Sequence, residues 1–198
     1  VDLLVRGRKK IISGHCGPEE ALGVNSRKDL AEVNRIINAR TLDRLMDSGV
    51  TVVDPATTYV DETAEVGKDT VIHPCTVIGT DVRIGPACSI GPFARLRPGT
   101  RVSRNAEIGN YVELCRSEIG EGTKVKHHTY LGDTKVGKNA NIGAGTITAN
   151  YDGRDKNRTE IGDNAFIGVG SILIAPVKVG RDSVVGAGSV VTRNRDVA

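Results

Sequence analysis

The chain has 198 residues, a formal net charge of +3, no tryptophan, two phenylalanines and four tyrosines. This length suits one or two domains, and a nearly balanced charge with no basic run among aromatics predicts no nucleic-acid partner. No apolar stretch is long enough to span a membrane and no signal peptide is visible, so we expect no membrane partner.

The cysteines and histidines show no metal-binding motif. The four cysteines, at positions 16, 75, 88 and 115, lack the paired spacing of a zinc site. The four histidines, at positions 15, 73, 127 and 128, lack a repeated HxxxH-type spacing. We therefore predict no metal site in this chain and a reduced, cytoplasmic protein.

A helix is predicted after a poorly patterned segment over residues 1–23. Ser26 is typical of a helix N-cap, and Asp29 three residues later completes a capping-box-like pair. Gly49 predicts the end of the helix. Its expected apolar face has three-four spacing and contains Leu30, Val33, Ile37, Leu42, Leu45 and Met46. A strand over 51–53 follows. The helix has no core of its own, so we expect it to pack on the next segment or on another domain.

From Val60 onward an aliphatic residue, here called a rung, recurs every six positions. A period of six fits neither a helix nor an alternating strand, so it indicates an internal repeat. The residue two positions before a rung is small or β-branched, as at Thr70 and Cys88, and glycine often follows a rung. The rungs are Val60, Val66, Ile72, Ile78, Ile84, Ile90, Leu96, Val102, Ile108, Leu114, Ile119, Val125, Leu131, Val136, Ile142, Ile161, Ile167, Leu173, Val179, Val185 and Val191.

The repeat predicts an all-β solenoid. Each hexad supplies one short strand and one corner, and three hexads close one triangular coil. The rung points inward, the small residue fits beside the turn, and the glycine after the rung is expected to tolerate a strained corner. Because one coil cannot bury its own apolar face, stability comes from stacking neighbouring coils.

The ladder has three irregular steps. Leu114 to Ile119 and Leu131 to Val136 are five residues long, and the rungs then skip from Ile142 to Ile161. The skip contains a polar loop over residues 150–158. Because loops on a rigid scaffold commonly carry binding and catalytic residues, we expect the functional site near these irregular steps.

Several residues have side chains suited to chemistry. His127 and His128 offer an imidazole, the commonest general base near neutral pH, although a lone histidine is usually structural. Arg97, beside a Pro-Gly corner, suits a phosphate, or is an ordinary surface arginine. The small residues of the Asn141–Gly145 segment would admit a ligand close to the backbone, or reflect tight packing alone.

Four segments resemble one kind of left-handed parallel β-helix acyltransferase. They are the runs over residues 90–99 (IGPFARLRPG), 108–113 (IGNYVE), 128–133 (HTYLGD) and 141–153 (NIGAGTITANYDG). They are similar to the glucosamine-1-phosphate N-acetyltransferase part of the bifunctional uridylyltransferase/acetyltransferase family that makes UDP-N-acetylglucosamine, a cell-wall precursor. The resemblance covers about residues 20–198, and the last two motifs are more specific than the hexads.

The resemblance implies an activity and a set of roles. The family acetylates glucosamine 1-phosphate from acetyl-CoA as a homotrimer, with active sites between neighbouring prisms. His127 would be the general base and Asn150 would orient the base or the substrate amine. The sugar phosphate would be bound by Arg97, Tyr130, Asn141 and Lys156, and acetyl-CoA by Ala144, Tyr151 and Ala187.

Four positions depart from the family pattern. Cys115 stands where the family has a phosphate-binding lysine, with Arg116 beside it as a substitute. Lys126 replaces the glycine before the base, and His128 replaces the leucine after it. Val169 replaces a serine of the CoA site. The chain also stops before the family's C-terminal arm.

The amino-terminal part resembles the end of the family's uridylyltransferase domain. Asn25 matches a position that binds Mg²⁺ there, but the nucleotide-binding glycine-rich loop is absent, so we expect no uridylyltransferase activity. The expected organisation is a uridylyltransferase remnant over residues 1–24, a linker helix over 25–50 and the β-helix acetyltransferase domain over 51–198.

Three alternatives to this acetyltransferase stay open. One is a hexapeptide acyltransferase with another amine acceptor, and another is a non-catalytic trimeric scaffold. A metal-dependent β-helix hydratase is the most distant of the three.

Overall fold

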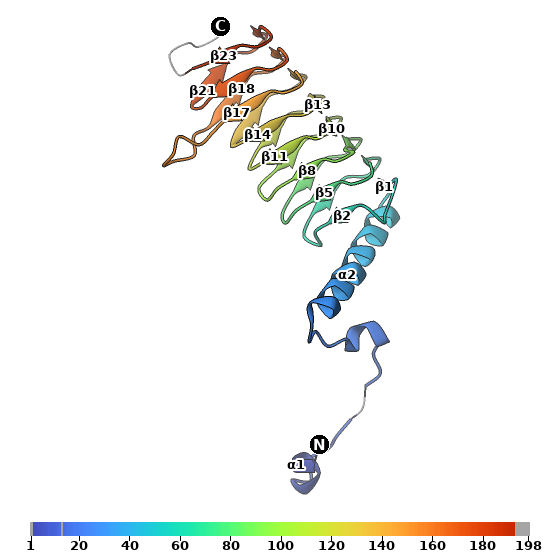
Figure 1. Cartoon of the computed structure of the whole chain (residues 1–198). Coiled ribbons are helices and arrows are strands. Elements are labelled where there is room, and N and C mark those ends of the chain that lie inside the picture. Colours follow the sequence, from blue (N-terminus) through green and yellow to red (C-terminus); the bar gives the residue numbers. More distant parts are fainter. Residues whose placement is uncertain (1, 13, 193–198) are drawn as a thin grey trace. The chain divides into compact units, whose positions relative to one another are not determined.

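The computed structural model describes residues 2–12 and 14–192, and these fall into two compact units (Figure 1). The first unit, Val1–Ile37, contains helix α1 (Asp2–Arg6), the short 3₁₀ helix η1 (Pro18–Ala21) and the start of helix α2 (Arg27–Asp47). The second, Asn38–Ala198, contains the rest of α2 and every strand.

The start of α2 forms the predicted capping box. The Asp29 backbone N–H donates to Ser26 Oγ at 3.2 Å, and the Ser26 N–H donates back to Asp29 Oδ2 at 2.9 Å. The Asn25 backbone N–H donates to the same carboxylate oxygen at 3.0 Å, and this bond contributes most to lowering the pKa of Asp29. The helix ends at Asp47, two residues before Gly49, whose φ is +92°.

The predicted apolar face of α2 is partly wrong. Leu30, Ile37 and Met46 are exposed, whereas Leu42 and Leu45 are buried. In the second unit this face also includes two polar residues, the partly buried Asn38 and the buried Thr41. The side chain of Asn38 donates to the Thr58 carbonyl at 2.9 Å and accepts from the Val60 N–H at 3.0 Å. Hydropathy alone did not reveal this face.

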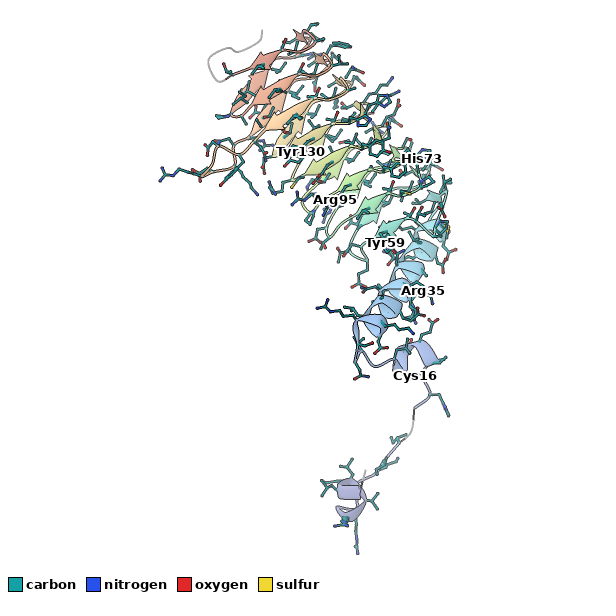
Figure 2. All side chains as sticks on the ribbon, viewed as in Figure 1. Cys16, Arg35, Tyr59, His73, Arg95 and Tyr130 are labelled. Carbon is teal, nitrogen blue, oxygen red and sulfur yellow. The ribbon has the colours of Figure 1, made fainter. Side chains whose placement is uncertain are left out.

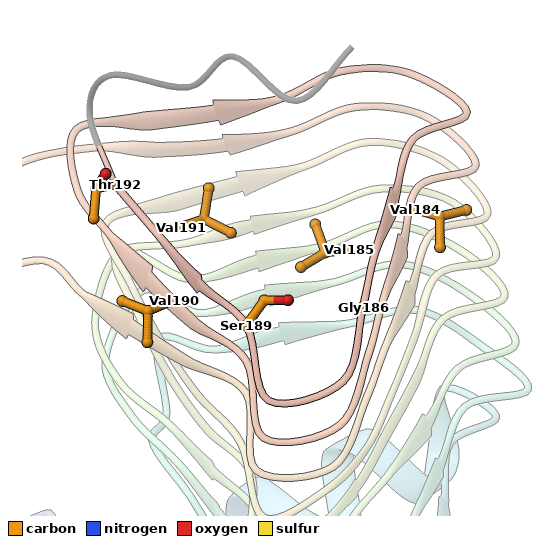
Figure 3. A pocket seen from close by; sticks show the side chains of 7 residues that line it. All are labelled: Val184, Val185, Gly186, Ser189, Val190, Val191 and Thr192. Carbon is orange, nitrogen blue, oxygen red and sulfur yellow. The ribbon is translucent and has the colours of Figure 1, made fainter.

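The strands stack as three parallel sheets that form the sides of a triangular prism (Figures 1 and 3). Sheet A contains, in order, β1 (Thr51–Val52), β4 (Val71–Ile72), β7 (Ser89–Ile90), β10 (Glu107–Asn110), β13 (Lys124–His127), β16 (Asn141–Ile142), β19 (Phe166–Ile167) and β22 (Val184–Val185). Sheet B contains β2 (Tyr59–Val60), β5 (Val77–Ile78), β8 (Arg95–Leu96), β11 (Glu113–Cys115), β14 (Tyr130–Gly132), β17 (Ile147–Ala149), β20 (Ile172–Ile174) and β23 (Val190–Val191). Sheet C contains β3 (Glu65–Val66), β6 (Arg83–Ile84), β9 (Arg101–Val102), β12 (Glu118–Ile119), β15 (Thr134–Val136), β18 (Thr159–Ile161) and β21 (Val177–Val179).

The rungs form the core, as predicted. Rungs of neighbouring coils pair in register, for example Ile72 with Ile90 and Ile90 with Ile108. Except for the partly buried Val66, the rungs within strands are buried, and the small residues two positions earlier, such as Thr70 and Cys88, are buried beside them. Burial raises the pKa of the Cys88 thiol.

The predicted reason for the glycines after the rungs is wrong. Apart from Gly91, none of them has a positive φ. Most of them are instead required by close stacking of coils. A Cβ on Gly67 would lie 2.5 Å from the backbone nitrogen of Pro86, and one on Gly85 would lie 2.6 Å from that of Arg104. The left-handed corner residues lie three positions before the rungs, where asparagine, aspartate and glycine are common.

All three irregular steps fall at the same corner of the prism, between sheets B and C. The two five-residue steps shorten this corner at Arg116 and Asp133, which have φ values of 48° and 51°. The next coil extends the same corner into the 150–158 loop, which projects from the prism in Figure 1. Over residues 2–12 and 14–192, no helix has the length and apolar character needed to cross a bilayer.

Candidate active site

The predicted site residues lie on two different faces of the prism. His127 ends β13 and Asn141 begins β16, both on sheet A, whereas Arg97 follows β8 and Tyr130 begins β14 on sheet B. Figure 2 shows Arg95 and Tyr130 on the sheet B face. Within the described part of the chain, no hydrogen bond or ion pair joins His127 to any of the other three.

His127 is exposed at the corner between sheets A and B, and its ring is held from the coil below. Its Nδ1 lies 2.8 Å from Oδ1 of Asn110, the residue that it faces in the β10–β13 ladder. The His127 carbonyl accepts from the Thr129 hydroxyl at 2.7 Å. Both the backbone and one ring nitrogen are therefore fixed, while Nε2 has no partner among residues 2–12 and 14–192.

An aromatic stack follows the same corner. The rings of Phe93 and Tyr111 stack with centroids 5.1 Å apart, and the Tyr111 and His128 rings stack at 4.9 Å. All three residues have positive φ values, which lie between 45° and 55°. Because His128 bonds through its backbone N–H to the Asn110 carbonyl at 3.0 Å, the stack and the ladder together position the two histidines.

The surface beside His127 is a small hollow on sheet A. It has a volume of about 220 Å³ and includes Gly91, Gly109, Asn110 and Lys126 in its lining. The ammonium of Lys126 lies 2.7 Å from Glu107 Oε2 and is therefore already neutralised by a carboxylate.

The corner above His127 presents small residues, with one exception. Ala144 and Ala187 occupy the positions equivalent to His127 in later coils, and Val169, 55% exposed, stands between them. The Gly170 N–H donates to the Ala144 carbonyl at 2.7 Å, and the Gly188 N–H donates to the Val169 carbonyl at 2.8 Å. The result is a shallow strip along the corner on which an extended ligand could lie close to the backbone.

On sheet B, the predicted phosphate ligand Arg97 is paired. Its Nη1 lies 3.0 Å from Glu113 Oε1, and this bond is the main reason that the pKa of Arg97 is raised. The buried Cys115 follows Leu114, which pairs with Leu96 in the ladder, and Tyr130 lies half-buried in the next coil. The face thus combines one ion pair, one thiol and one phenol.

The shortened corner forms a second charged cluster. Arg116 donates to both carboxylate oxygens of Asp133, from Nε at 2.5 Å and from Nη2 at 2.7 Å, and from Nη1 to the Cys115 sulfur at 2.9 Å. Asn150 Nδ2 also donates to Asp133 Oδ2 at 2.5 Å. The Arg116 bond is the largest cause of the lowered pKa of Asp133, and the pKa of Arg116 is raised in turn.

This cluster places Asn150 on Asp133, in a coil and corner different from those of His127. The amide that contacts the His127 ring is that of Asn110. The adjoining loop is organised by Asp152, whose Oδ1 accepts backbone N–H groups from Arg154 at 3.0 Å and Asp155 at 2.9 Å. Tyr151 and Lys156 face each other across the base of this loop as an antiparallel bridge.

Two other features concern Asn25 and the final described coil. Asn25 is exposed, and no group of three or more potential metal-ligating His, Cys, Asp or Glu residues is found over 2–12 and 14–192. A hollow of about 470 Å³ opens at the final described coil, where Val185, Ser189 and Val191 point inward (Figure 3). None of the predicted site residues lines it.

Comparisons with known proteins agree with the repeat. A model described as bacterial transferase hexapeptide (six repeats) matches residues 63–98, and a hexapeptide repeat of succinyl-transferase matches residues 158–193. The two matched segments therefore carry the hexapeptide repeat that these models describe. A solved UDP-N-acetylglucosamine acyltransferase from Campylobacter jejuni shares the fold, with a TM-score of 0.52 at 17% identity over 74% of this chain and 68% of that one.

Curated relatives of higher identity resemble most of this chain. The bifunctional protein GlmU of Thermotoga petrophila is 45% identical over 88% of this chain and 47% of the relative. GlmU of Pelotomaculum thermopropionicum is 48% identical over 81% of this chain and 42% of the relative. The chain thus spans about half the length of these relatives.

Asn110 and Asp133 were missed as site residues in the sequence. A detectable signal existed, because one coil that contains a five-residue step is 17 residues long. Asn110 precedes His127 by 17 residues, and Asp133 precedes Asn150 by 17. Counting one coil back from each predicted residue would have found both partners.

Proposed function

We propose that this chain transfers the acetyl group of acetyl-CoA to the amine of glucosamine 1-phosphate. The observation that carries the proposal is the 45% identity to proteins named bifunctional GlmU over 88% of the chain. The exposed His127, with one ring nitrogen bonded and the other open, supplies the group that amide formation needs.

The chemistry follows from that geometry. The neutral sugar amine attacks the thioester carbonyl, and Nε2 of His127 takes the proton that the amine loses as the carbon–nitrogen bond forms. The carbon–sulfur bond then breaks, and the imidazolium returns the proton to the CoA thiolate, so that free CoA leaves. No covalent enzyme intermediate is required. In this proposal Asn150 contributes by holding the 150–158 loop in place through its hydrogen bond to Asp133.

The acceptor and donor sites occupy different surfaces in this proposal. Arg97, Tyr130 and Lys156 bind the sugar phosphate from sheet B and its loop, joined by Asn141 from sheet A. The thioester arm lies along the strip of small residues at Ala144 and Ala187, with Tyr151 at its side. Val169 and the Lys126–Glu107 pair lie beside the strip of small residues and limit its width.

Because the base lies on one face of the prism and the phosphate ligands on another, one copy cannot surround a small substrate. We therefore include a homotrimer in the proposal, in which sheet A of one copy faces sheet B of the next. Cyclic symmetry then repeats the same site three times. The expected domain division at residues 24 and 50, the cytoplasmic location and the restriction of Mg²⁺ to a uridylyltransferase domain belong to the same proposal.

A CoA-release assay tests the activity. Release should require both acetyl-CoA and glucosamine 1-phosphate, and should be weaker with other amino sugars or amino acids. Release that depends on a different amine would replace the acceptor in this proposal. A trimer with no transfer to any acceptor would instead support a scaffold role.

Mixed oligomers test the location of the site. His127→Ala alters the sheet A side and Arg97→Ala the sheet B side, so each homo-oligomer should be impaired. Co-expressed with separate tags, the two variants should form hybrids with one intact interface and regain part of the wild-type rate. If purified hybrids stay as inactive as the separate variants, the site does not lie between copies.

A further inference from the structure

His127 can act as a base only if the correct ring nitrogen is free. A neutral imidazole carries one proton, and the hydrogen bond made by one nitrogen decides which of the two carries it. Among the described residues, the only side chain that hydrogen-bonds to the His127 ring is that of Asn110, whose Oδ1 lies 2.8 Å from Nδ1. An amide oxygen accepts and cannot donate, so the proton is placed on Nδ1 and the lone pair on Nε2.

We propose that Asn110 is a positioning residue that fixes the tautomer and the ring orientation of His127. The inference rests on the proposed function, because it assumes that His127 is the base. It adds a residue with which neither the family resemblance nor the ladder pattern associates a role. Among the described residues, the side chain of Asn110 hydrogen-bonds to His127 alone.

The surrounding structure holds Asn110 itself in place. Strands β10 and β13 are each four residues long where most sheet A strands have two, and the added pairing extends to Asn110 opposite His127. The Asn110 carbonyl accepts the His128 N–H at 3.0 Å. The next residue, Tyr111, stacks between Phe93 and His128. The amide therefore projects from a backbone that is fixed on both sides.

The charged groups near the ring are paired with one another. On β10 and β13 they are Glu107, Lys124 and Lys126, and the Glu107 carboxylate pairs with the two ammonium groups at 3.8 Å and 2.7 Å. On β16, above the ring, Asn141 and Ile142 carry no charge. The other titratable ring at the corner is His128, stacked on Tyr111. A neutral amide, rather than a carboxylate, is thus the group that directs the imidazole.

The experiment reads the tautomer and the rate separately. Nitrogen-15 spectra of the trimer without substrates should show the neutral His127 ring protonated on Nδ1 in the wild type. In Asn110→Ala this preference should be lost. The kcat for acetyl transfer should fall about 10–100-fold, as expected for a misplaced catalytic group, while the KM values change less than threefold.

Asn110→Asp supplies the conservative comparison. Its carboxylate also accepts from Nδ1, so the tautomer and part of the rate should return. A negative charge beside the ring favours the imidazolium, so the rise of kcat/KM with pH should move to higher pH. Asn105→Asp is the matched control, because it makes the same change at the left-handed corner before β10, away from the ring.

Three results would overturn the inference. They are an unchanged His127 tautomer in Asn110→Ala, a kcat within threefold of wild type, or an Asn110→Asp profile that matches that of Asn105→Asp. The spectra also separate the two proposals. A wild type that shows the Nδ1–H tautomer but transfers no acetyl group removes the proposed function and leaves the positioning of the ring intact.

Discussion

Asp133 joins the shortened corner to the loop, and replacing it tests how that corner is held. Asp133→Asn keeps the size of the side chain and suits the positive φ of 51°, so the change removes little besides the charge. The carboxylate accepts two bonds from Arg116 and one from Asn150. An amide offers one oxygen, and its NH₂ group would face another donor.

The structure sets the size of the effect. Losing charge-assisted hydrogen bonds costs about 1.5–3 kcal/mol. Because the Arg116 side chain is 39% exposed, solvent screening favours the lower half of that range. Asp182→Asn is the matched control, since Asp182 has a similar φ of 59° and accepts from Asn164 at 2.8 Å, but its side chain is 64% exposed. The control should change stability by less than about 1 kcal/mol.

Urea unfolding over a range of pH provides the assay. The folded-state pKa of Asp133 is lowered, so its stabilisation is complete above the unfolded-state value of about 3.9 and is lost as pH falls through the folded value. The stability gap between wild type and Asp133→Asn should therefore be constant from pH 7 to 5 and close below about pH 4. A gap no larger than that of Asp182→Asn, or one that widens in acid, would refute the reasoning.

Three further predictions concern the prism and the sheet B face. Leu114→Ala should lower the free energy of unfolding by about 2–5 kcal/mol, since the side chain is fully buried, and an unchanged urea midpoint would contradict the core assignment. Gly85→Ala should lower the free energy of unfolding more than Gly186→Ala does. An added Cβ at Gly85 would lie 2.6 Å from the Arg104 backbone nitrogen, whereas one at Gly186 would lie no closer than 3.6 Å to any atom. Equal urea midpoints for the two variants would disprove the stacking argument. Arg97→Ala should raise the KM for glucosamine 1-phosphate about 10–100-fold and change the KM for acetyl-CoA little. Arg83→Ala, on sheet C, is the control and should change neither KM. An equal rise of both KM values in Arg97→Ala would remove Arg97 from the phosphate site.

The repeat was predictable because the same residue pattern recurs in every coil. Each rung has the same neighbours above and below, so a single period determines inward residues, small residues and sheet register together. The capping box at Ser26 was readable for a similar reason, since all its contacts lie within four residues. By contrast, the buried face of α2 depends on bonds from Asn38 to Thr58 and Val60, which lie about 20 residues away.

The site was less predictable because it depends on which corner each irregular step occupies. The two short steps appeared to flank His127 in sequence. In space they stack with the loop at the corner between sheets B and C, while His127 lies at the corner between sheets A and B. The glycines were placed correctly and explained wrongly, since composition cannot distinguish a positive φ from a close approach of two backbones.

The most direct measurement is the rate of CoA release by wild type and His127→Ala, with acetyl-CoA and glucosamine 1-phosphate. His73→Ala is the control, because His73 lies on sheet A of an earlier coil and bonds to Ser89 at 3.1 Å. The account predicts a loss of about 10²–10⁴-fold for His127→Ala and none for His73→Ala. A loss of less than tenfold for His127→Ala would contradict it.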